Sequence, residues 1–366
     1  MRIAFYAPLK SPNHPVPSGD RQMARLLIAA LEKAGHSIEL ASELRSFAAT
    51  PDDAAREDIS ASATEEVKRL CSHWAEMARP DLWFSYHPYY KAPDLIGPSI
   101  AARVNIPYVT AEASYSQRRN ASGWAALQSL VVDAVRQAAV NLCFTERDIR
   151  GLAAAIPGAQ LERLLPFIDT TPFKASNAER NPGQLVTVAM MRSGDKLESY
   201  RVLANALSLI TGERWRLTII GDGPAGPEVR TLFSKFENDR IEWLGEQPPE
   251  IVRNVLRRSS VYVWPGIGEA YGIAYMEAQA AGLPVVAQAI AGVPEVVKDG
   301  VTGVLTMPGN TKAYADAIAM VLGDEQRRAK MSLAARHFIT QERSLEMASN
   351  RLDQILQQYL GRQHDD

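Results

Sequence analysis

The stretch from Gly266 to Val286, GIGEAYGIAYMEAQAAGLPVV, decides the fold because it joins two short apolar runs through a glycine-containing loop and a helical segment. It directly follows the apolar run Val261–Trp264 and ends within the next run, Pro284–Ala287. Strand, loop, helix and strand in this order make a βα unit, whose strands lie parallel in one sheet. A helix is predicted to begin near Ala270, with its free N–H groups directed at the glycine-containing loop.

The same alternation of apolar runs and amphipathic stretches recurs along the chain and predicts two α/β units. Its clearest helix is Asp20–Ala34, which Gly35 ends. Residues 169–183 are polar and rich in helix breakers, which is typical of an interdomain linker. We therefore expect an N-terminal domain at 1–168, a second domain at 184–342, and a helix at 343–366 that packs back toward the N-terminal domain. The predicted strands are Ile3–Ala7, Ser37–Ala41, Asp81–Tyr86, Tyr108–Ala111, Val140–Phe144, Leu161–Phe167, Leu185–Met191, Arg216–Gly221, Ile241–Leu244, Val261–Trp264, Pro284–Ala287 and Val304–Met307.

Composition excludes several classes of protein. A length of 366 residues exceeds what one hydrophobic core usually organises, and 46% hydrophobic with 22% charged residues is typical of a globular protein. The net charge of -2 argues against nucleic-acid binding. Cys71 and Cys143 form no CxxC pair, so neither a disulfide framework nor a structural zinc site is expected.

The first residues do not resemble a signal peptide, and no apolar run reaches the ~20 residues that span a bilayer. A cytoplasmic protein is expected, with peripheral contact at the inner membrane face left open.

Two carboxylates stand near the predicted helix start, where ligands bind in parallel α/β sheets. If the segment between Glu269 and Glu277 were helical, their backbones would be roughly 12 Å apart. This spacing suits an extended ligand better than the carboxyl pair of a glycosidase, which needs roughly 5–9.5 Å. A helix start behind Gly266 and Gly268 attracts phosphate. Taken singly, however, each glutamate fits equally well as a helix-terminal or solvated surface charge.

The whole string resembles the glutamate-x7-glutamate signature of the retaining glycosyltransferases of family 4, also called glycosyl transferases group 1. The resemblance continues through Gly292–Val297 and Asp299–Gly303. It implies a GT-B fold, with two Rossmann-like domains whose parallel sheets face each other across a cleft. It also implies that Glu269 contacts the transferred sugar and that Glu277 holds the ribose hydroxyls. The remaining donor-binding residues that it implies in this string are Gly266, Ile267, Tyr271, Gly272 and Ile273.

A basic pair follows the predicted strand Leu185–Met191. The segment Met190–Lys196 resembles the family segment that supplies an Arg and a Lys to the leaving diphosphate. The matching residues in this chain are Arg192 and Lys196. Cleavage of a glycosyl–phosphate bond leaves negative charge, which fixed cations stabilise. The spacing is one residue shorter than is usual in the family, and a surface pair at a helix start is the alternative. Because this pair supplies positive charge and no Asp-x-Asp element is present, neither a metal nor another cofactor is expected.

The first half of the chain offers fewer signals. Gly19 lies where the resemblance places a loop that faces the donor. The same sequence is also explained by a turn in which Ser18 or Asp20 caps the next helix. His87 and Glu112 each follow a predicted strand and are candidate residues on the acceptor side. Many family members carry a histidine where this chain has Glu112, and His87 fits equally well as a packed or capping residue.

The resemblance implies a hexosyltransferase that moves a sugar from a UDP- or GDP-linked donor to an acceptor hydroxyl with retention. The acceptor, whether a glycan, a lipid-linked molecule or a small molecule, is not identified by any motif, and neither is the oligomeric state. An NAD-dependent oxidoreductase is disfavoured because no G-x-G-x-x-G follows the first strand. A phosphorylase or epimerase of the same fold and a non-catalytic subunit that binds a sugar nucleotide both remain open.

Overall fold

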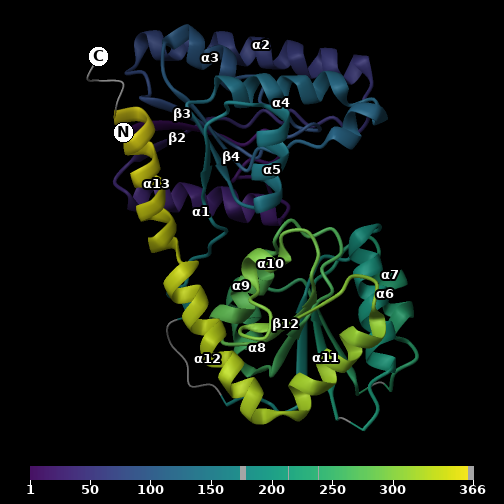
Figure 1. The fold of residues 1–366 in the computed structure, drawn as a ribbon. Coiled ribbons are helices and arrows are strands. Elements are labelled where there is room, and N and C mark those ends of the chain that lie inside the picture. Colours follow the sequence, from purple (N-terminus) through teal and green to yellow (C-terminus); the bar gives the residue numbers. More distant parts are fainter. Residues whose placement is uncertain (174–178, 213, 238, 362–366) are drawn as a thin grey trace. The chain divides into compact units, whose positions relative to one another are not determined.

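The computed structural model describes residues 1–173, 179–212, 214–237 and 239–361 (Figure 1). The chain divides into two compact units. The first unit comprises Met1–Leu165 and the C-terminal segment that begins at Leu345, and the second comprises Pro166–Ser344. Each unit has its own parallel sheet, and each predicted strand is present in one of the two.

The described part of the first unit forms a six-stranded parallel sheet in the order β2-β1-β3-β4-β5-β6. One face of this sheet packs Tyr6 and Trp83 against Trp74 and the helix that carries it. The last strand is shorter than predicted, because it ends at Arg163 and not at Phe167. The strands are β1 Arg2–Tyr6, β2 Ser37–Ser42, β3 Leu82–Tyr86, β4 Tyr108–Ala111, β5 Val140–Cys143 and β6 Leu161–Arg163.

The described part of the second unit forms another six-stranded parallel sheet, in the order β12-β11-β10-β7-β8-β9. Its strands match the predicted ones to within a few residues. They are β7 Gln184–Val188, β8 Arg216–Ile220, β9 Ile241–Gly245, β10 Val261–Val263, β11 Val285–Gln288 and β12 Gly303–Thr306.

Helices connect the strands in both units. The predicted helix Asp20–Ala34 is α1, where the Ser18 side chain accepts a hydrogen bond from Arg21 N. The other helices of the first unit are α2 Asp53–Glu76, α3 Gly97–Val104, α4 Ala125–Gln137, α5 Glu146–Ala155 and the 3-10 turn Gln117–Ser122. Those of the second are α6 Asp195–Ser208, α7 Gly226–Phe233, α8 Pro249–Arg258, α9 Ile273–Ala280, α10 Val293–Val296, α11 Thr311–Gly323, α12 Glu325–Glu342 and the 3-10 turn Thr171–Phe173.

The last helix, α13 Leu345–Leu360, belongs to the first unit and packs against α1 (Figure 1). It begins at Leu345 and not at Arg343, because Arg343 is the C-cap of α12 and its buried guanidinium donates to the Glu295 carbonyl at 3.1 Å. An ion pair of 2.5 Å joins Arg351 of α13 to Glu162 in β6.

The predicted linker, residues 169–183, belongs to the second unit in its described parts, and residues 174–178 lie outside the described residues. Arg180 Nη1 donates to Ser332 Oγ at 2.7 Å. The chain passes between the units earlier, at Leu165–Pro166, and again after Ser344. Ile168 N donates to the Arg343 carbonyl at 2.9 Å, so the two connecting segments lie side by side.

Each sheet has one point where the order of its strands reverses. In the first unit this switch point lies between β1 and β3, and in the second between β7 and β10. The crossovers on either side of a switch point leave in opposite directions, which opens a crevice at the carboxyl ends of the two strands. These two crevices are where ligand sites are expected.

We expect the packing of α13 to stabilise the first unit substantially. Leu356 is fully buried, so Leu356→Ala should lower the free energy of unfolding by about 2–5 kcal/mol through lost burial and the cavity that remains. The exposed Gln358 on the same helix provides the control, because Gln358→Ala should change stability by less than about 0.5 kcal/mol. Urea denaturation followed by circular dichroism measures both. Equal stabilities of the two variants would contradict the packing of α13.

Candidate active site

The switch point of the second unit brings together two of the predicted catalytic residues. Lys196, in the first turn of α6 after β7, forms an ion pair with Glu269 in the loop after β10. Trp264 Nε1 donates to the same Glu269 oxygen at 3.1 Å, and Lys196 Nζ lies 5.5 Å from the centroid of the Trp264 ring. Both charged side chains are partly buried, at 27% exposed for Lys196 and 18% for Glu269. The pair is therefore held in place and still accessible.

Two glycines fix the loop that carries Arg192. A Cβ at Gly221 would lie 1.9 Å from the Ala189 carbonyl oxygen, and one at Gly223 would lie 2.3 Å from that of Met191, so the backbones approach too closely for any other residue. The sequence Gly221–Pro224, GDGP, thus positions the loop after β7. Arg192 is exposed on this loop, and its side chain makes no ion pair with any residue that the structure describes.

The helix that follows Glu269 begins later than predicted. α9 begins at Ile273 and not near Ala270, because Gly272 has a φ of 85°, which interrupts helical geometry. Glu269 and Glu277 therefore do not share one unbroken helix, and the separation calculated from helical rise does not apply. Gly266, Ile267 and Tyr271 lie in the loop, where Ile267 N donates to Ser199 Oγ at 3.1 Å. Glu277 lies in α9 and is half-buried.

The switch point of the first unit also holds a charged pair. Asp20, in the first turn of α1, lies 3.0 Å from Nδ1 of His87, which directly follows β3. Glu112 follows the neighbouring strand β4 and accepts a hydrogen bond of 2.9 Å from the Tyr86 hydroxyl. His87 and Glu112 have φ angles of 60° and 58°, a left-handed conformation that is uncommon outside glycine and occurs often at functional sites. At Gly19 an added Cβ would meet no atom within 4 Å, so packing does not require glycine there.

Burial and mutual attraction shift the pKa values of this group. Burial opposes the charge on His87, but Glu112 and Asp20 outweigh it and raise the pKa of His87 to about 9. Burial raises the pKa of Glu112 to about 7, although His87 acts against this. For Asp20, burial acts upward, but the hydrogen bond and the charge of His87 hold its pKa below the ordinary value. His87 is thus a cation at neutral pH.

Sequence reasoning missed two residues of these sites. Trp264 directly follows β10, and a buried indole N–H needs a hydrogen-bond acceptor, but nothing in the amino-acid sequence identified that acceptor as Glu269. Asp20 was considered only as a helix cap, whereas Ser18 is the cap. The carboxylate of Asp20 is used instead to bind His87.

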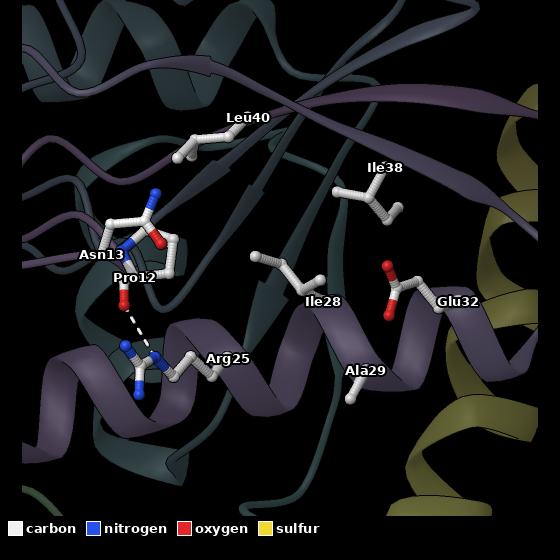
Figure 2. A pocket seen from close by; sticks show the side chains of 8 residues that line it. All are labelled: Pro12, Asn13, Arg25, Ile28, Ala29, Glu32, Ile38 and Leu40. Atoms are coloured by element: carbon white, nitrogen blue, oxygen red, sulfur yellow. Dashed lines mark hydrogen bonds between the residues drawn. The ribbon is translucent and has the colours of Figure 1, made fainter.

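Other features of the described residues lie apart from these two sites. A cavity of about 280 Å³ lies between α1 and the edge strand β2, where Arg25 donates to the Pro12 carbonyl, and no predicted site residue lines it (Figure 2). Among the residues that the structure describes, no group of three or more His, Cys, Asp or Glu side chains is placed to hold a metal ion. Within the same residues, no helix is both long and apolar enough to cross a bilayer.

The pKa of His87 predicts a pH dependence of stability. Because folding raises this pKa, His87 contributes stability that is fully present below its unfolded pKa of about 6.5 and is lost as the pH rises through about 9. The unfolding free energy should therefore fall from about pH 7.5 to about pH 9 more steeply in the natural chain than in His87→Gln. Urea denaturation across this range measures it. The exposed His337 is the control, and a His87→Gln profile parallel to that of His337→Gln would contradict the assignment.

The chain is similar to known glycosyltransferases in sequence. Residues 174–338 match the family described as glycosyl transferases group 1. A D-inositol 3-phosphate glycosyltransferase from Nocardia farcinica is 32% identical over 192 residues, which are 49% of this chain and 41% of that protein. An alpha-D-kanosaminyltransferase from Streptomyces kanamyceticus is 28% identical over 233 residues, 60% of each chain. The chain spans about half the length of the curated relatives that it matches.

Solved structures resemble it over nearly their whole length. A sucrose-phosphate synthase from Thermosynechococcus elongatus has a TM-score of 0.77 with 17% identity and covers 99% of both chains. The Anabaena protein HepE in complex with UDP has a TM-score of 0.76 with 16% identity, covering 98% of this chain and all of HepE. Such identities show the fold alone. Residues 174–338 therefore match the glycosyl transferases group 1 family in sequence, and the fold of the chain is that of the GT-B glycosyltransferases.

Proposed function

We propose that the chain is a retaining glycosyltransferase that moves a hexose-type sugar from a UDP- or GDP-linked donor to an acceptor hydroxyl. The observation that carries the proposal is the Lys196–Glu269 pair at the switch point of the second unit, inside the segment that matches the family. HepE, a neighbour in fold, binds UDP and UDP-glucose, which supports a nucleotide sugar as donor.

The pair suggests how a diphosphate is received. Glu269 is the counter-charge of Lys196 in the structure. A bound diphosphate competes for Lys196, and the Glu269 carboxylate then becomes available to hydroxyls of the transferred sugar. Arg192 makes no ion pair with any described residue, so it can interact with the diphosphate without first breaking one. Negative charge that develops on the leaving group is stabilised best by such fixed cations in a partly dry site.

The other predicted residues complete the donor site. The backbone N–H groups of Tyr271, Gly272 and Ile273 stand at the start of α9, where a helix favours a phosphate. Glu277, further along α9, binds the ribose hydroxyls. Gly266 and Ile267, in the loop after β10, complete the donor contacts proposed for the second unit.

The reaction then follows from charge and position. The bond between the anomeric carbon and the donor phosphate oxygen breaks, the acceptor hydroxyl forms a new bond on the same face, and the donor phosphate takes the hydroxyl proton. The chain supplies positioning and charge stabilisation and forms no covalent intermediate. Neither a metal nor an organic cofactor takes part.

One observation favours a second candidate, a subunit that binds a sugar nucleotide without catalysing transfer. Arg192 is exposed, and the described contacts do not connect its side chain to the Lys196–Glu269 pair. Release of free sugar from UDP-glucose or GDP-mannose in the absence of acceptor distinguishes the two candidates. Binding without any release supports the subunit.

We expect Arg192→Ala and Lys196→Ala each to reduce turnover by about ten- to a thousand-fold, the scale of one lost transition-state charge contact. Arg201, an exposed cation on the same helix α6, is the matched control, and Arg201→Ala should keep normal turnover. Steady-state rates with the best donor measure all three. Near-normal turnover with unchanged donor affinity in both site variants would show that the diphosphate binds elsewhere.

Transfer should persist in excess chelator, and the product should keep the anomeric configuration of the donor. Arg192, Lys196 and the start of α9 supply the positive charge that a metal otherwise provides. Coupling constants of the anomeric proton, read by NMR before mutarotation, give the configuration. An inverted product, or activity lost to chelator and restored by magnesium, would refute the proposed mechanism.

A further inference from the structure

Three arginines of the second unit gather at the edge of its sheet where the strands begin. Arg180 lies just before β7, and its Nη2 donates at 3.2 Å to the carbonyl of Ala281, which ends α9 ahead of β11. Arg336 of α12 donates from Nη2 to the same carbonyl oxygen at 3.4 Å. Arg328 stands about two turns earlier on α12, which packs against α9 (Figure 1). We call these three residues the arginine cluster.

The guanidinium groups of the cluster are neighbours. Arg180 Nη1 donates to Ser332 Oγ at 2.7 Å, and Ser332 stands midway between Arg328 and Arg336 on α12. Residues four apart share one face of a helix, so Arg180 lies against the face that carries the other two arginines. A Cβ added at Gly282 would lie 2.6 Å from Arg180 Nη2 and 3.2 Å from Arg336 Nη2, so these two groups also pack on one stretch of backbone.

The positive charge of the cluster is only partly balanced. None of the three arginines forms an ion pair with a carboxylate of the residues that the structure describes. Arg328 Nη1 donates to the last carbonyls of α11, at 2.7 and 3.1 Å, as the other two do at the end of α9. A helix C-terminus carries roughly half a negative charge, so two helix ends offset about one of the three positive charges. A surplus of about two positive charges is left.

Burial makes this surplus costly. Arg180 is partly buried, and its pKa is held below the ordinary value first by burial and then by the charges of Arg336 and Arg328. A guanidinium nevertheless stays protonated at neutral pH, so the repulsion between the three groups persists. Each guanidinium also has five N–H donors, and most of those in the cluster have no described acceptor. An anion bound here would accept such donors and remove the repulsion.

We propose that the arginine cluster is a binding site for a phosphomonoester group. Such a group carries about −1.5 to −2 charges at pH 7 and three acceptor oxygens, which match the surplus charge and the three guanidinium groups. Planar guanidinium groups bind phosphate oxygens in pairs, and a carboxylate offers only one charge and two oxygens. The group can come from a small phosphorylated molecule or from a lipid headgroup.

This site is separate from the proposed donor site. The Lys196–Glu269 pair follows β7 and β10, whereas the arginine cluster precedes β7 and β11. The N–H groups proposed to receive the diphosphate stand at the start of α9, and the cluster stands at its end, eight residues or roughly 12 Å away. The inference therefore does not depend on the proposed function.

Calorimetric titration of the full chain with inorganic phosphate, at constant ionic strength, tests the site. We expect Arg180→Gln and Arg336→Gln each to weaken phosphate binding by about tenfold or more, the scale of one lost hydrogen bond to a charged group. Arg327→Gln is the matched control, because Arg327 is a cation of the same helix that is already paired with Asp324 at 3.5 Å. It should bind phosphate normally. Lys196→Ala should also keep this binding, since it alters only the donor site.

Melting temperatures give a second measurement. Phosphate should raise the melting temperature of the natural chain, because only the folded state has the site. Arg336 is exposed, so Arg336→Gln should fold, and without phosphate it should be at least as stable as the natural chain because one of the like charges is gone. Phosphate should then stabilise this variant little. Arg336→Lys keeps the charge without the planar fork and should recover part of the effect.

Vesicles distinguish the two sources of the phosphate group. The full chain and Arg336→Gln are sedimented with vesicles of phosphatidylcholine alone and of phosphatidylcholine with phosphatidic acid. Sedimentation that needs both phosphatidic acid and Arg336 indicates a lipid headgroup. Binding of free phosphate without sedimentation indicates a small phosphorylated molecule. Both results support the site.

Three results would overturn the inference. The first is that the natural chain binds neither free phosphate nor the phosphatidic acid vesicles. The second is binding that Arg180→Gln and Arg336→Gln leave unchanged, or that Arg327→Gln weakens equally, because the attraction would then be diffuse. The third is phosphate binding that is lost in Lys196→Ala and kept in Arg336→Gln, which would place the anion at the donor site. Transfer from UDP-glucose or GDP-mannose is measured separately, and none of these results decides it.

Discussion

The reversal of strand order in each sheet is the constraint on which both sites depend. A parallel sheet that grows from its first strand in both directions must send two crossovers apart at one point, and the ends of the two strands there are left uncovered. In the second unit the reversal brings together Lys196 and Glu269, which are 73 residues apart in the chain. In the first it brings together Asp20 and His87, 67 residues apart. Neither pair is local, and topology alone makes them neighbours.

The two pairs stand at corresponding switch points of their sheets, but their chemical surroundings differ. Lys196 and Glu269 stand against the Trp264 indole, with one cation and one anion, so an incoming anion can replace the carboxylate as partner of the lysine. His87 lies among several carboxyl groups and aromatic rings. Those acids keep the ring protonated while leaving little net positive charge. The first pair thus balances one cation with one anion, whereas the single imidazole of the second pair is influenced by several carboxyl groups.

The amino-acid sequence predicted the strands well, because a strand buried in a parallel sheet is a short apolar run between breakers, as in Tyr108–Ala111. It located Lys196 and Glu269 through motif text. It could not place the start of α9, since the left-handed φ of Gly272 leaves no mark on hydrophobic periodicity. The role of Asp20 was hidden for a different reason: a carboxylate at a helix start is explained by capping until its partner from a distant strand is known. The break at Arg343, which separates α12 from α13, likewise depends on a contact with a distant carbonyl.

The place of α13 in the first unit has a consequence for how the protein is made. Residues of the second unit form one continuous stretch, Pro166–Ser344, and can fold as soon as that stretch leaves the ribosome. The first unit is interrupted, and the face of α1 that α13 covers stays uncovered until residues 345–360 have been synthesised. The unit whose synthesis begins first is therefore completed last. During translation its apolar helix surface is exposed for the time needed to add the whole second unit, and transiently exposed apolar surface of this kind is prone to aggregation.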